Sequence, residues 1–501
     1  MPRKRKMLLF VPVPFLFVSL IYCSKDKLDK PPTERSNFNR IVSEKFIAQL
    51  PPWAGSQVVL VGPSNTPISG LVGREGSITI SPDGRRVAYV YRIVHRAGVV
   101  VDGKSEQAYE RIIRGPIFSP DSKHVAYTAE LEGKVFVVVD DKKYKPYDGV
   151  TLPVFSPDGS RVAYVALMGA KYFVVVDEQP SKPYDGFGSS SLLFSPDSKR
   201  FAYVAYMAVP QRFFVVVDGK EEKSYDVIMN LVFSPDSKRL AYAVSANSKT
   251  IIVVDGEKQK QYDGFLEGTL QFSSDSKHFV YGAGLSNKQF FVVDGNEEKQ
   301  YDMTVRGTFT FRPNDGQIVY AAGIGNKEFV VVGGKEEKQY DRISECSLIV
   351  SPDGSRMAYA AQIDNKWVVV VDGKEGNKYD YIAMYKDRDG KDLITASSIV
   401  FSPDSKHIAY GARVGNKWFV VVDGKEQKQY DGIGTLTFSP DGNRIAYTVR
   451  AEVDYKWLVV IDGNEGKHYE TISNIFFDSP DQFHYIAIRD DGIYFVQENL
   501  R

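Results

Sequence analysis

The six histidines are the first residues to examine, because histidine is a common general base and metal ligand. Three of them follow the same Asp-Ser-Lys segment: His124, His278 and His407. Related segments carry arginine at that place: Arg161, Arg200 and Arg239. A position that accepts either residue indicates a solvent-exposed strand start and not a general base. The other three histidines are isolated and lack metal-ligand spacing: His95, His468 and His484.

A repeated aspartate is the second candidate, since it recurs in a Ser-Pro-Asp segment or a close variant. Its positions are Asp83, Asp121, Asp158, Asp197, Asp236, Asp275, Asp353, Asp404, Asp441 and Asp481, with a degenerate copy around Asn314. A ring of carboxylates is one interpretation. The alternative is that each carboxylate bonds the backbone of its own turn, and we expect this structural role.

One acidic segment stands apart and resembles part of a calcium loop: Asp387, Arg388, Asp389, Gly390, Lys391 and Asp392. An EF-hand would have an acidic residue two positions before Asp387 and an apolar one two positions after Gly390. Tyr385 and Asp392 stand there instead, so a surface turn is expected and calcium is the alternative. The sequence also lacks a nucleophile elbow, a phosphate-binding loop and a dinucleotide motif. We therefore predict no catalytic residue, metal or cofactor.

The two cysteines, Cys23 and Cys346, cannot form a disulfide framework or a cysteine metal site. Cys346 falls in a predicted inner strand, where a small buried residue is expected. Cys23 follows a basic segment, residues 3–6, and a short apolar stretch, residues 7–22, which Pro12 and Pro14 interrupt. This arrangement is typical of a secretory signal and not of a membrane-spanning helix.

The segment Leu20-Ile21-Tyr22-Cys23 resembles a bacterial lipobox, in which the cysteine is lipidated and becomes the mature N-terminus. Leu20 matches that pattern, whereas Tyr22 stands where a small residue usually precedes the cysteine. The resemblance implies a lipid anchor at Cys23, and ordinary secretion or an uncleaved anchor is the alternative. The expected location is therefore outside the cytoplasm, on a membrane in the periplasm or on the cell surface.

Residues 24–55 are expected to form a polar tether and a short helix. Pro31 and Pro32 favour an extended tether. From Ser36, a plausible N-cap, the apolar residues fall at helical spacing, and Pro51-Pro52 would end the helix. The spaced residues are Phe38, Ile41, Val42, Phe46, Ile47 and Leu50.

Residues 56–501 consist of repeats. The eleven copies of the Ser-Pro-Asp segment lie 37 to 40 residues apart, with one longer step of 51. A period near 40 is the length of a propeller blade with four strands. Each unit divides into four short apolar or charged runs separated by Ser-Pro-Asp, a variable loop and Asp-Gly. The sequence therefore predicts an all-β fold, a β-propeller of about eleven four-stranded blades after the signal and short helix.

The four predicted strands differ in composition, which predicts where each lies. The third is apolar without alternation, so both of its faces should be buried. The fourth is short and charged, as in "KEEKQYD", which suits an exposed outer edge. Its repeated tyrosine should pack between adjacent blades: Tyr225, Tyr262, Tyr301, Tyr340, Tyr379 and Tyr430.

The segments "FSPDGSRVAYVA" and "FSPDSKRFAYVA", each followed by an apolar strand, resemble the WD40-like repeats of the TolB C-terminal propeller. The propeller of prolyl-oligopeptidase-type peptidases contains similar repeats. The resemblance covers about residues 73–490. It implies the fold and no particular activity, because this fold hosts many functions.

The arrangement of eleven units stays open, because propellers typically have 4 to 8 blades. Two rings of five or six blades are slightly favoured over one large ring. Residues 57–71 look like the second half of a blade and residues 475–496 like a first half. Pairing the chain ends would close a ring and remove an open edge.

The formal net charge is zero, so nucleic acid is an unexpected partner.

The loops between second and third strands differ from copy to copy, and the insertion, about 381–397, is expected to be a fourth-to-first connection on that same face. We predict a non-catalytic scaffold of the bacterial cell envelope that binds a protein or other envelope ligand there. The predicted contacts are Lys386, Asp387, Arg388, Asp389, Lys391 and Asp392. The alternative is a propeller enzyme, such as a lyase or lactonase, with a site built from loops; the apolar inner strands argue against a polar site in the channel.

Overall fold

The structure, a computed structural model, contains only strands, turns and irregular segments in its described part. It describes residues 39–49, 59–61, 77–188, 192–246, 249–382, 385–386, 392–393, 399–452, 454–490 and 492–501. Eleven sheets of the same design, each with four antiparallel strand positions, follow one another along this part of the chain. We number these blades 1 to 11, starting with the blade that contains β3.

Each blade has four strand positions, counted outward from the ring centre. The inner position is formed by β3 (Ser77–Ile80), β7 (Arg111–Phe118), β11 (Gly149–Val150) with β12 (Val154–Phe155), β16 (Gly186–Phe187) with β17 (Leu193–Phe194), β21 (Val227–Phe233), β25 (Gly264–Phe272), β29 (Met303–Phe311), β33 (Arg342–Ile343) with β34 (Ile349–Val350), β38 (Tyr381–Ile382) with β41 (Ile399–Phe401), β45 (Gly432–Phe438), and β49 (Thr471–Ile472) with β50 (Phe476–Ser479). The second position is formed by β4 (Val87–Ile93), β8 (Val125–Leu131), β13 (Val162–Met168), β18 (Phe201–Ala208), β22 (Leu240–Ala246), β26 (Phe279–Leu285), β30 (Ile318–Ile324), β35 (Met357–Ile363), β42 (Ile408–Val414), β46 (Ile445–Arg450) and β51 (Gln482–Arg489).

The two outer positions differ in length and composition. The third is formed by β5 (Arg96–Val101), β9 (Lys134–Val139), β14 (Lys171–Val176), β19 (Gln211–Val217), β23 (Lys249–Val254), β27 (Lys288–Val293), β31 (Lys327–Val332), β36 (Lys366–Val371), β43 (Lys417–Val422), β47 (Trp457–Ile461) and β52 (Gly492–Leu500). The fourth is formed by β6 (Lys104–Ser105), β10 (Lys142–Lys143), β15 (Gln179–Pro180), β20 (Lys220–Tyr225), β24 (Glu257–Tyr262), β28 (Asn296–Glu297), β32 (Lys335–Glu336), β37 (Lys374–Glu375), β44 (Lys425–Glu426), β48 (Asn464–Glu465) and, in blade 11, β1 (Arg40–Gln49).

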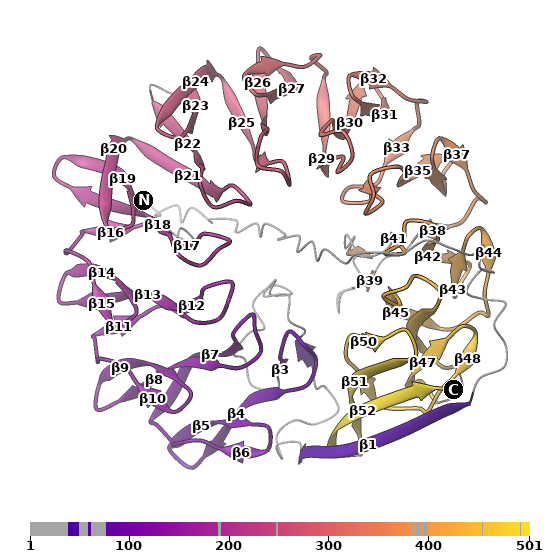
Figure 1. The fold of residues 1–501 in the computed structure, drawn as a ribbon, viewed down its shortest axis with the longest axis horizontal. Helices are drawn as coiled ribbons and strands as arrows, with labels where there is room; N and C mark the ends of the chain where they lie inside the picture. The colour runs from indigo at the N-terminus through magenta and orange to yellow at the C-terminus, as the bar shows by residue number, and fades with distance from the viewer. Residues whose placement is uncertain are drawn as a thin grey trace, which may run out of the picture.

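All eleven blades stand in one ring (Figure 1). The fold is therefore a single β-propeller, and the slight preference for two rings was wrong. The wedge angle between neighbouring blades depends on how side chains of both blades pack together. The repeat pattern shows each blade's own strands and turns but not this angle, so it gives the number of blades without the number of rings.

The ring is closed by the N-terminal strand. β1 runs antiparallel to β52, so that Arg40 lies opposite Leu500 and Gln49 opposite Gly492. The helix predicted from Ser36 to Leu50 is thus a strand where the structure describes it, and the propeller includes residues that were assigned to the tether. A β-bulge between Phe46 and Ala48 interrupts the alternation of side chains. Ile41, Val42 and Phe46, which gave the helical spacing, are exposed on this strand, so their spacing does not mark a buried face.

A buried ion pair holds β1 in place. The Arg40 guanidinium donates to both carboxylate oxygens of Glu498, which is fully buried, and to the carbonyl oxygen of Val459 at 3.1 Å. The Tyr485 hydroxyl donates to the same carboxylate at 2.7 Å. The expected closure by the chain ends is confirmed, but the partner is β1 and not residues 57–71. Within that range, β2 (Val59–Val61) runs parallel to β3 on its inner side.

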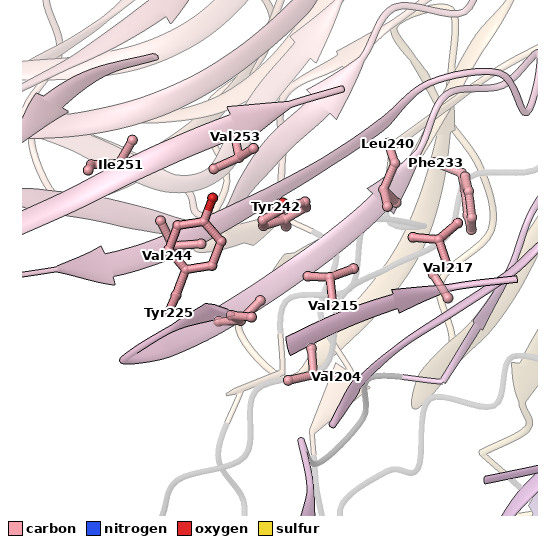
Figure 2. Close-up of a cluster of buried hydrophobic side chains, with 12 residues drawn as sticks. Val204, Val215, Val217, Tyr225, Phe233, Leu240, Tyr242, Val244, Ile251 and Val253 are labelled. Carbon is pink, nitrogen blue, oxygen red and sulfur yellow. The ribbon is translucent and has the colours of Figure 1, made fainter. Parts of the chain in front are cut away.

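The hydrophobic core is divided into layers between successive blades. One such layer joins Val204, Val215 and Tyr225 of blade 4 to Tyr242 and Val253 of blade 5 (Figure 2). The repeated tyrosines of the outer position lie in these layers, as predicted. Five of the six predicted tyrosines pack edge-on or tilted against a tyrosine of the next blade at ring-centroid distances near 6 Å, 6.2 Å for Tyr225 and Tyr242. The sixth, Tyr430, lies in one core layer with Tyr447 of the next blade.

The charges of the outer strands also connect the blades. Lys299 of blade 6 pairs with Glu336 of blade 7 at 2.6 Å, and Lys338 pairs in the same way with Glu375. At the closing junction Lys467 pairs with Glu44 of β1, which also accepts from the Tyr469 hydroxyl. The charged outer edge was predicted to block pairing with other chains; it also forms ion pairs between blades.

Candidate functional site

The propeller has two faces of different construction. The turns between first and second strands, which contain Ser-Pro-Asp, and those between third and fourth strands lie on one face, here called the Ser-Pro-Asp face. The turns between second and third strands, and the links from one blade to the next, lie on the opposite face, here called the variable face.

The repeated aspartate of the Ser-Pro-Asp face has the structural role that the sequence predicted. In the turn of blade 6, Ser273 Oγ donates to Asp275 Oδ1 at 2.6 Å, and the Lys277 amide donates to the same oxygen at 3.1 Å. The Ser273 hydroxyl and the Lys277 amide lower the pKa of Asp275 to about 2. The same serine-to-aspartate bond recurs in nine blades. These carboxylates stabilise turns.

Where an arginine stands at the position after the turn, it also contacts the next blade, so the expected solvent-exposed strand start describes this position only in part. Arg161 Nε donates to Asp177 of its own blade at 2.8 Å, and Nη1 donates to the carbonyl oxygens of Ser198 and Lys199 of the next blade at 3.0 and 2.9 Å. Four other blades repeat this contact through Arg86, Arg200, Arg239 and Arg356.

The three histidines at this position are paired within their own blades. Each ring places Nδ1 within 2.5 to 2.7 Å of an aspartate of its own blade, in the pairs His124–Asp140, His278–Asp294 and His407–Asp423. The hydrogen bond to Asp423 raises the pKa of His407. Two of the histidines predicted to be isolated are also paired, His468 with Asp454 and His484 with Asp478.

The choice between arginine and histidine at this position correlates with the fourth residue of the turn in the next blade. Every arginine named above precedes a blade whose turn has serine in its fourth place, and that serine Oγ accepts the aspartate amide of the arginine's own blade at 2.9 to 3.1 Å. The serines are Ser122, Ser198, Ser237, Ser276 and Ser405. His124 and His407 precede blades with glycine there, Gly159 and Gly442, whereas the turn after His278 has Asp315 in the fourth place and Gly316 in the fifth. The variation between copies on this face therefore serves the fit between blades.

The variable face also contains repeated structural carboxylates. Asp148 Oδ1 pairs with Lys134 Nζ at 2.6 Å, and its Oδ2 accepts the Gly169 amide at 2.7 Å. The Lys134 and Gly169 hydrogen bonds lower the pKa of Asp148. Equivalent lysine or arginine pairs recur around the ring at Asp185, Asp226, Asp263, Asp302, Asp341, Asp380 and Asp431.

The variable face differs from the other face in its exposed apolar side chains. Val94, Val209 and Tyr455, in turns between second and third strands, are 83, 85 and 69 % exposed. Further exposed residues lie at the same ends of second strands: Ile93, Met168, Ile324 and Val414. Among the described residues, no large apolar side chain is exposed in a Ser-Pro-Asp or Asp-Gly turn. Exposed apolar side chains that gather on one surface indicate a contact with another molecule.

The insertion does not join two blades, so its assignment as a fourth-to-first connection was wrong. It interrupts the inner strand of blade 9: Ile382 of β38 lies opposite Ala412, and Ile399 of β41 lies opposite Tyr410. Inside it, β39 (Tyr385–Lys386) pairs with β40 (Asp392–Leu393). Figure 1 places β39 on the inner side of the ring, near β41. Asp387, Arg388, Asp389 and Lys391 lie outside the described residues, so their predicted contacts stay predictions.

The inner strands of other blades are broken or bulged at the same level. Four exposed charged residues occur there and were missed by the sequence analysis: Arg114, Glu267, Arg306 and Glu345. Each is followed by a residue with positive φ, namely Gly115, Gly268, Gly307 or Cys346. Cys346 therefore lies in a turn and is only half-buried, contrary to the expected inner strand. Burial raises the pKa of its thiol.

Within the described ranges, no group of three or more histidine, cysteine, aspartate or glutamate side chains is arranged to hold a metal ion. The same part of the chain contains no helix that is long and apolar enough to span a membrane. Cys23 precedes these ranges, so its predicted lipidation is untested.

No family model matches the chain, and no curated protein matches it. Several solved structures are similar to it. A eukaryotic initiation factor has 12 % identity and a TM-score of 0.37, over 71 % of this chain and 98 % of that chain. The Dos1 propeller has 11 % identity and a TM-score of 0.32, over 69 and 92 %. The β-propeller domain of the Trilobed protease from Pyrococcus furiosus has 12 % identity and a TM-score of 0.25, over 54 and 91 %.

Proposed function

We propose that this protein is a non-catalytic scaffold that binds a protein partner through its variable face. The observation that carries the proposal is the difference between the two sets of turns. Val94, Val209 and Tyr455 are exposed in turns of the variable face, whereas no large apolar side chain is exposed in the described turns of the other face. On the Ser-Pro-Asp face, the repeated polar groups bond to their own turn or to the next blade. Because these groups already have hydrogen-bond partners within the protein, few of them are available to bind a ligand.

We further propose that the scaffold acts in the bacterial cell envelope. The basic segment, the apolar stretch and Cys23 support export and a lipid anchor, and the repeats resemble those of the TolB propeller. Two acyl chains would hold the protein firmly on a bilayer. The insertion is proposed as a further contact, because Ile382 and Ile399 bring it off the inner strand near the variable face.

A photo-crosslinking experiment tests the proposed face. The full chain is expressed in its native host with a photoreactive amino acid in place of Tyr455, on the variable face, or of Lys277, which is 77 % exposed on the Ser-Pro-Asp face. Irradiation should produce a discrete crosslinked protein from position 455 and none from position 277. The same product from both positions, or a product from position 277 alone, would contradict the proposal.

A fatty-acid probe tests the anchor. Wild-type protein should incorporate the probe and Cys23→Ala should not. Equal labelling of both would show that Cys23 is not the attachment site.

A further inference from the structure

Three consecutive blades share a row of side chains that the other blades lack. The row crosses the inner, second and third strands, near the turns of the variable face. Its members are Arg342–Gln362–Trp367 in blade 8, Tyr381–Arg413–Trp418 in blade 9 and Gly432–Arg450–Trp457 in blade 10. Each of these rows contains one arginine and one tryptophan. No other described blade combines the two at this register.

In the described part of the chain, no ion pair joins any of the three arginines to a carboxylate, although Arg413 is close enough to Asp380 to help lower the pKa of that carboxyl. Arg342 and Arg450 are exposed, and Arg413 is half-buried with an Nε that donates no hydrogen bond. Blade 2 provides an internal comparison. There Arg111 has the position of Arg342, but Glu130 lies opposite and pairs with it at 2.6 Å. Gln362 replaces that glutamate in blade 8 and leaves Arg342 without a countercharge.

The aromatic rings hold one of these guanidinium groups in a fixed orientation. Arg413 Cζ lies 5.0 Å from the ring centroid of Tyr381 and 5.4 Å from that of Trp418, and the two rings meet edge-on at 6.5 Å. Stacking restricts the long side chain before a ligand arrives, so less conformational entropy is lost on binding. A planar guanidinium that is held in this way matches the geometry of a carboxylate.

The carboxylates closest in sequence neutralise the row only in part, through the interaction of Asp380 with Arg413. Asp341, Asp380 and Asp431 begin these blades, but each pairs with a lysine, namely Lys327, Lys366 or Lys417. The row is therefore a local excess of positive charge in a chain whose formal net charge is zero.

From this geometry we infer that the row of blades 8 to 10 binds a segment of the partner protein that is rich in aspartate and glutamate. The inference rests on the proposed function and names the chemistry of the partner. Three arginines on neighbouring blades suit carboxylates spaced along an extended chain. A nucleic acid would need a longer track of basic residues.

Fluorescence anisotropy with the full chain tests the inference. The probe is a labelled oligoglutamate peptide, and an oligoglutamine peptide of equal length is the control. Wild type should bind oligoglutamate and not oligoglutamine. The triple variant R342A/R413A/R450A should bind it about tenfold more weakly or worse, because it removes all three cations that would pair with the carboxylates of the peptide.

Two matched variants separate this effect from unfolding. Gln362→Glu should weaken binding severalfold, because it gives Arg342 the countercharge that Arg111 has, and it should leave thermal stability unchanged. Arg111→Ala should leave binding unchanged. Equal affinity of wild type, the triple variant and Gln362→Glu would overturn the inference. Tighter binding of a labelled oligothymidylate, or of anionic lipid vesicles, that is lost in the triple variant would also overturn it.

The crosslink from position 455 distinguishes this inference from the proposed function. If the crosslink forms but is insensitive to the triple variant, the acidic-segment inference fails alone. If no crosslink forms in wild type, the proposed function fails as well.

Discussion

The Ser-Pro-Asp face and the variable face are built from the same eleven repeats, but their side chains are used differently. On the first face, Arg161 bonds to the next blade and Asp275 to its own turn. On the second, Val94 and Val209 are largely exposed, and Arg342 lacks a partner among the described residues. Variation between copies therefore has two meanings. On the Ser-Pro-Asp face it adjusts one blade to the next, and on the variable face it leaves side chains available for another molecule.

The largest effect should come from breaking the ring closure, on which both faces depend. Arg40→Ala leaves the fully buried Glu498 carboxylate without its cation, which should destabilise the protein by about 3 to 5 kcal/mol. The midpoint of guanidinium unfolding measures this. Lys467→Ala, at the exposed end of the same junction, is the control and should change stability by about 0.5 kcal/mol at most. An unchanged midpoint for Arg40→Ala would show that β1 does not close the ring.

A pH-dependent effect is expected at the rim between blades 1 and 2. Glu106 Oε2 is buried without a hydrogen-bond partner, and burial raises the pKa of Glu106 to about 7. Folding thus favours the protonated form of Glu106. The stability that comes from this preference is fully present below pH 4.5 and is lost as the pH rises through about 7. Glu106→Gln should stabilise the protein by about 1 to 2 kcal/mol near pH 8, after allowance for solvent screening, and not at all in acid.

Unfolding midpoints of both proteins across this pH range test that prediction. A difference that is independent of pH, or one that grows toward acid, would refute it.

An exchange of turn residues tests the fit between blades on the Ser-Pro-Asp face. A Cβ at Gly159 would collide with the Asp121 carboxylate of the preceding blade, and Gly159 has a φ of +76°. Gly159→Ser alone should destabilise by about 1 to 2 kcal/mol. The double variant H124R/G159S should recover much of this loss, because blades with serine are preceded by arginine. A double-mutant cycle measures the coupling. Additive losses would contradict the correlation.

The smallest effect on stability is expected on the variable face. Val94→Ser and Val209→Ser replace side chains that are more than four-fifths exposed, so each should change the unfolding free energy by about 0.5 kcal/mol at most. Thermal melts provide the measurement. A large loss would show that these residues pack against the propeller and are not available to a partner.

The repeat period and the gradient from apolar to charged strands predicted the blades correctly, because both are local properties of each unit. The tyrosine contacts followed for the same reason. Closure by the chain ends was predicted, but its strand was not, because Arg40 and Glu498 meet across 458 positions. The position of the insertion required the register of β38 and β41 on β42, which the sequence spacing does not contain.

The charged residues Arg114 and Glu267 on the inner strands could have been found, since each precedes a glycine within an otherwise apolar segment. The arginine row could not. The row is recognised only when the strand register is known, because the register places Gln362 opposite Arg342 and Glu130 opposite Arg111.

The difference between the faces is tested most directly by capture of the partner with two matched triple variants. V94S/V209S/Y455S alters the variable face, and K123A/K238A/K277A alters exposed lysines of the Ser-Pro-Asp face. Each tagged protein is used to pull down, from native membranes, the protein that crosslinks at position 455. The first variant should lose most of the captured protein while its melting temperature stays near that of wild type, and the second should capture as much as wild type. Equal capture by both variants, or loss with the lysine variant alone, would contradict the account.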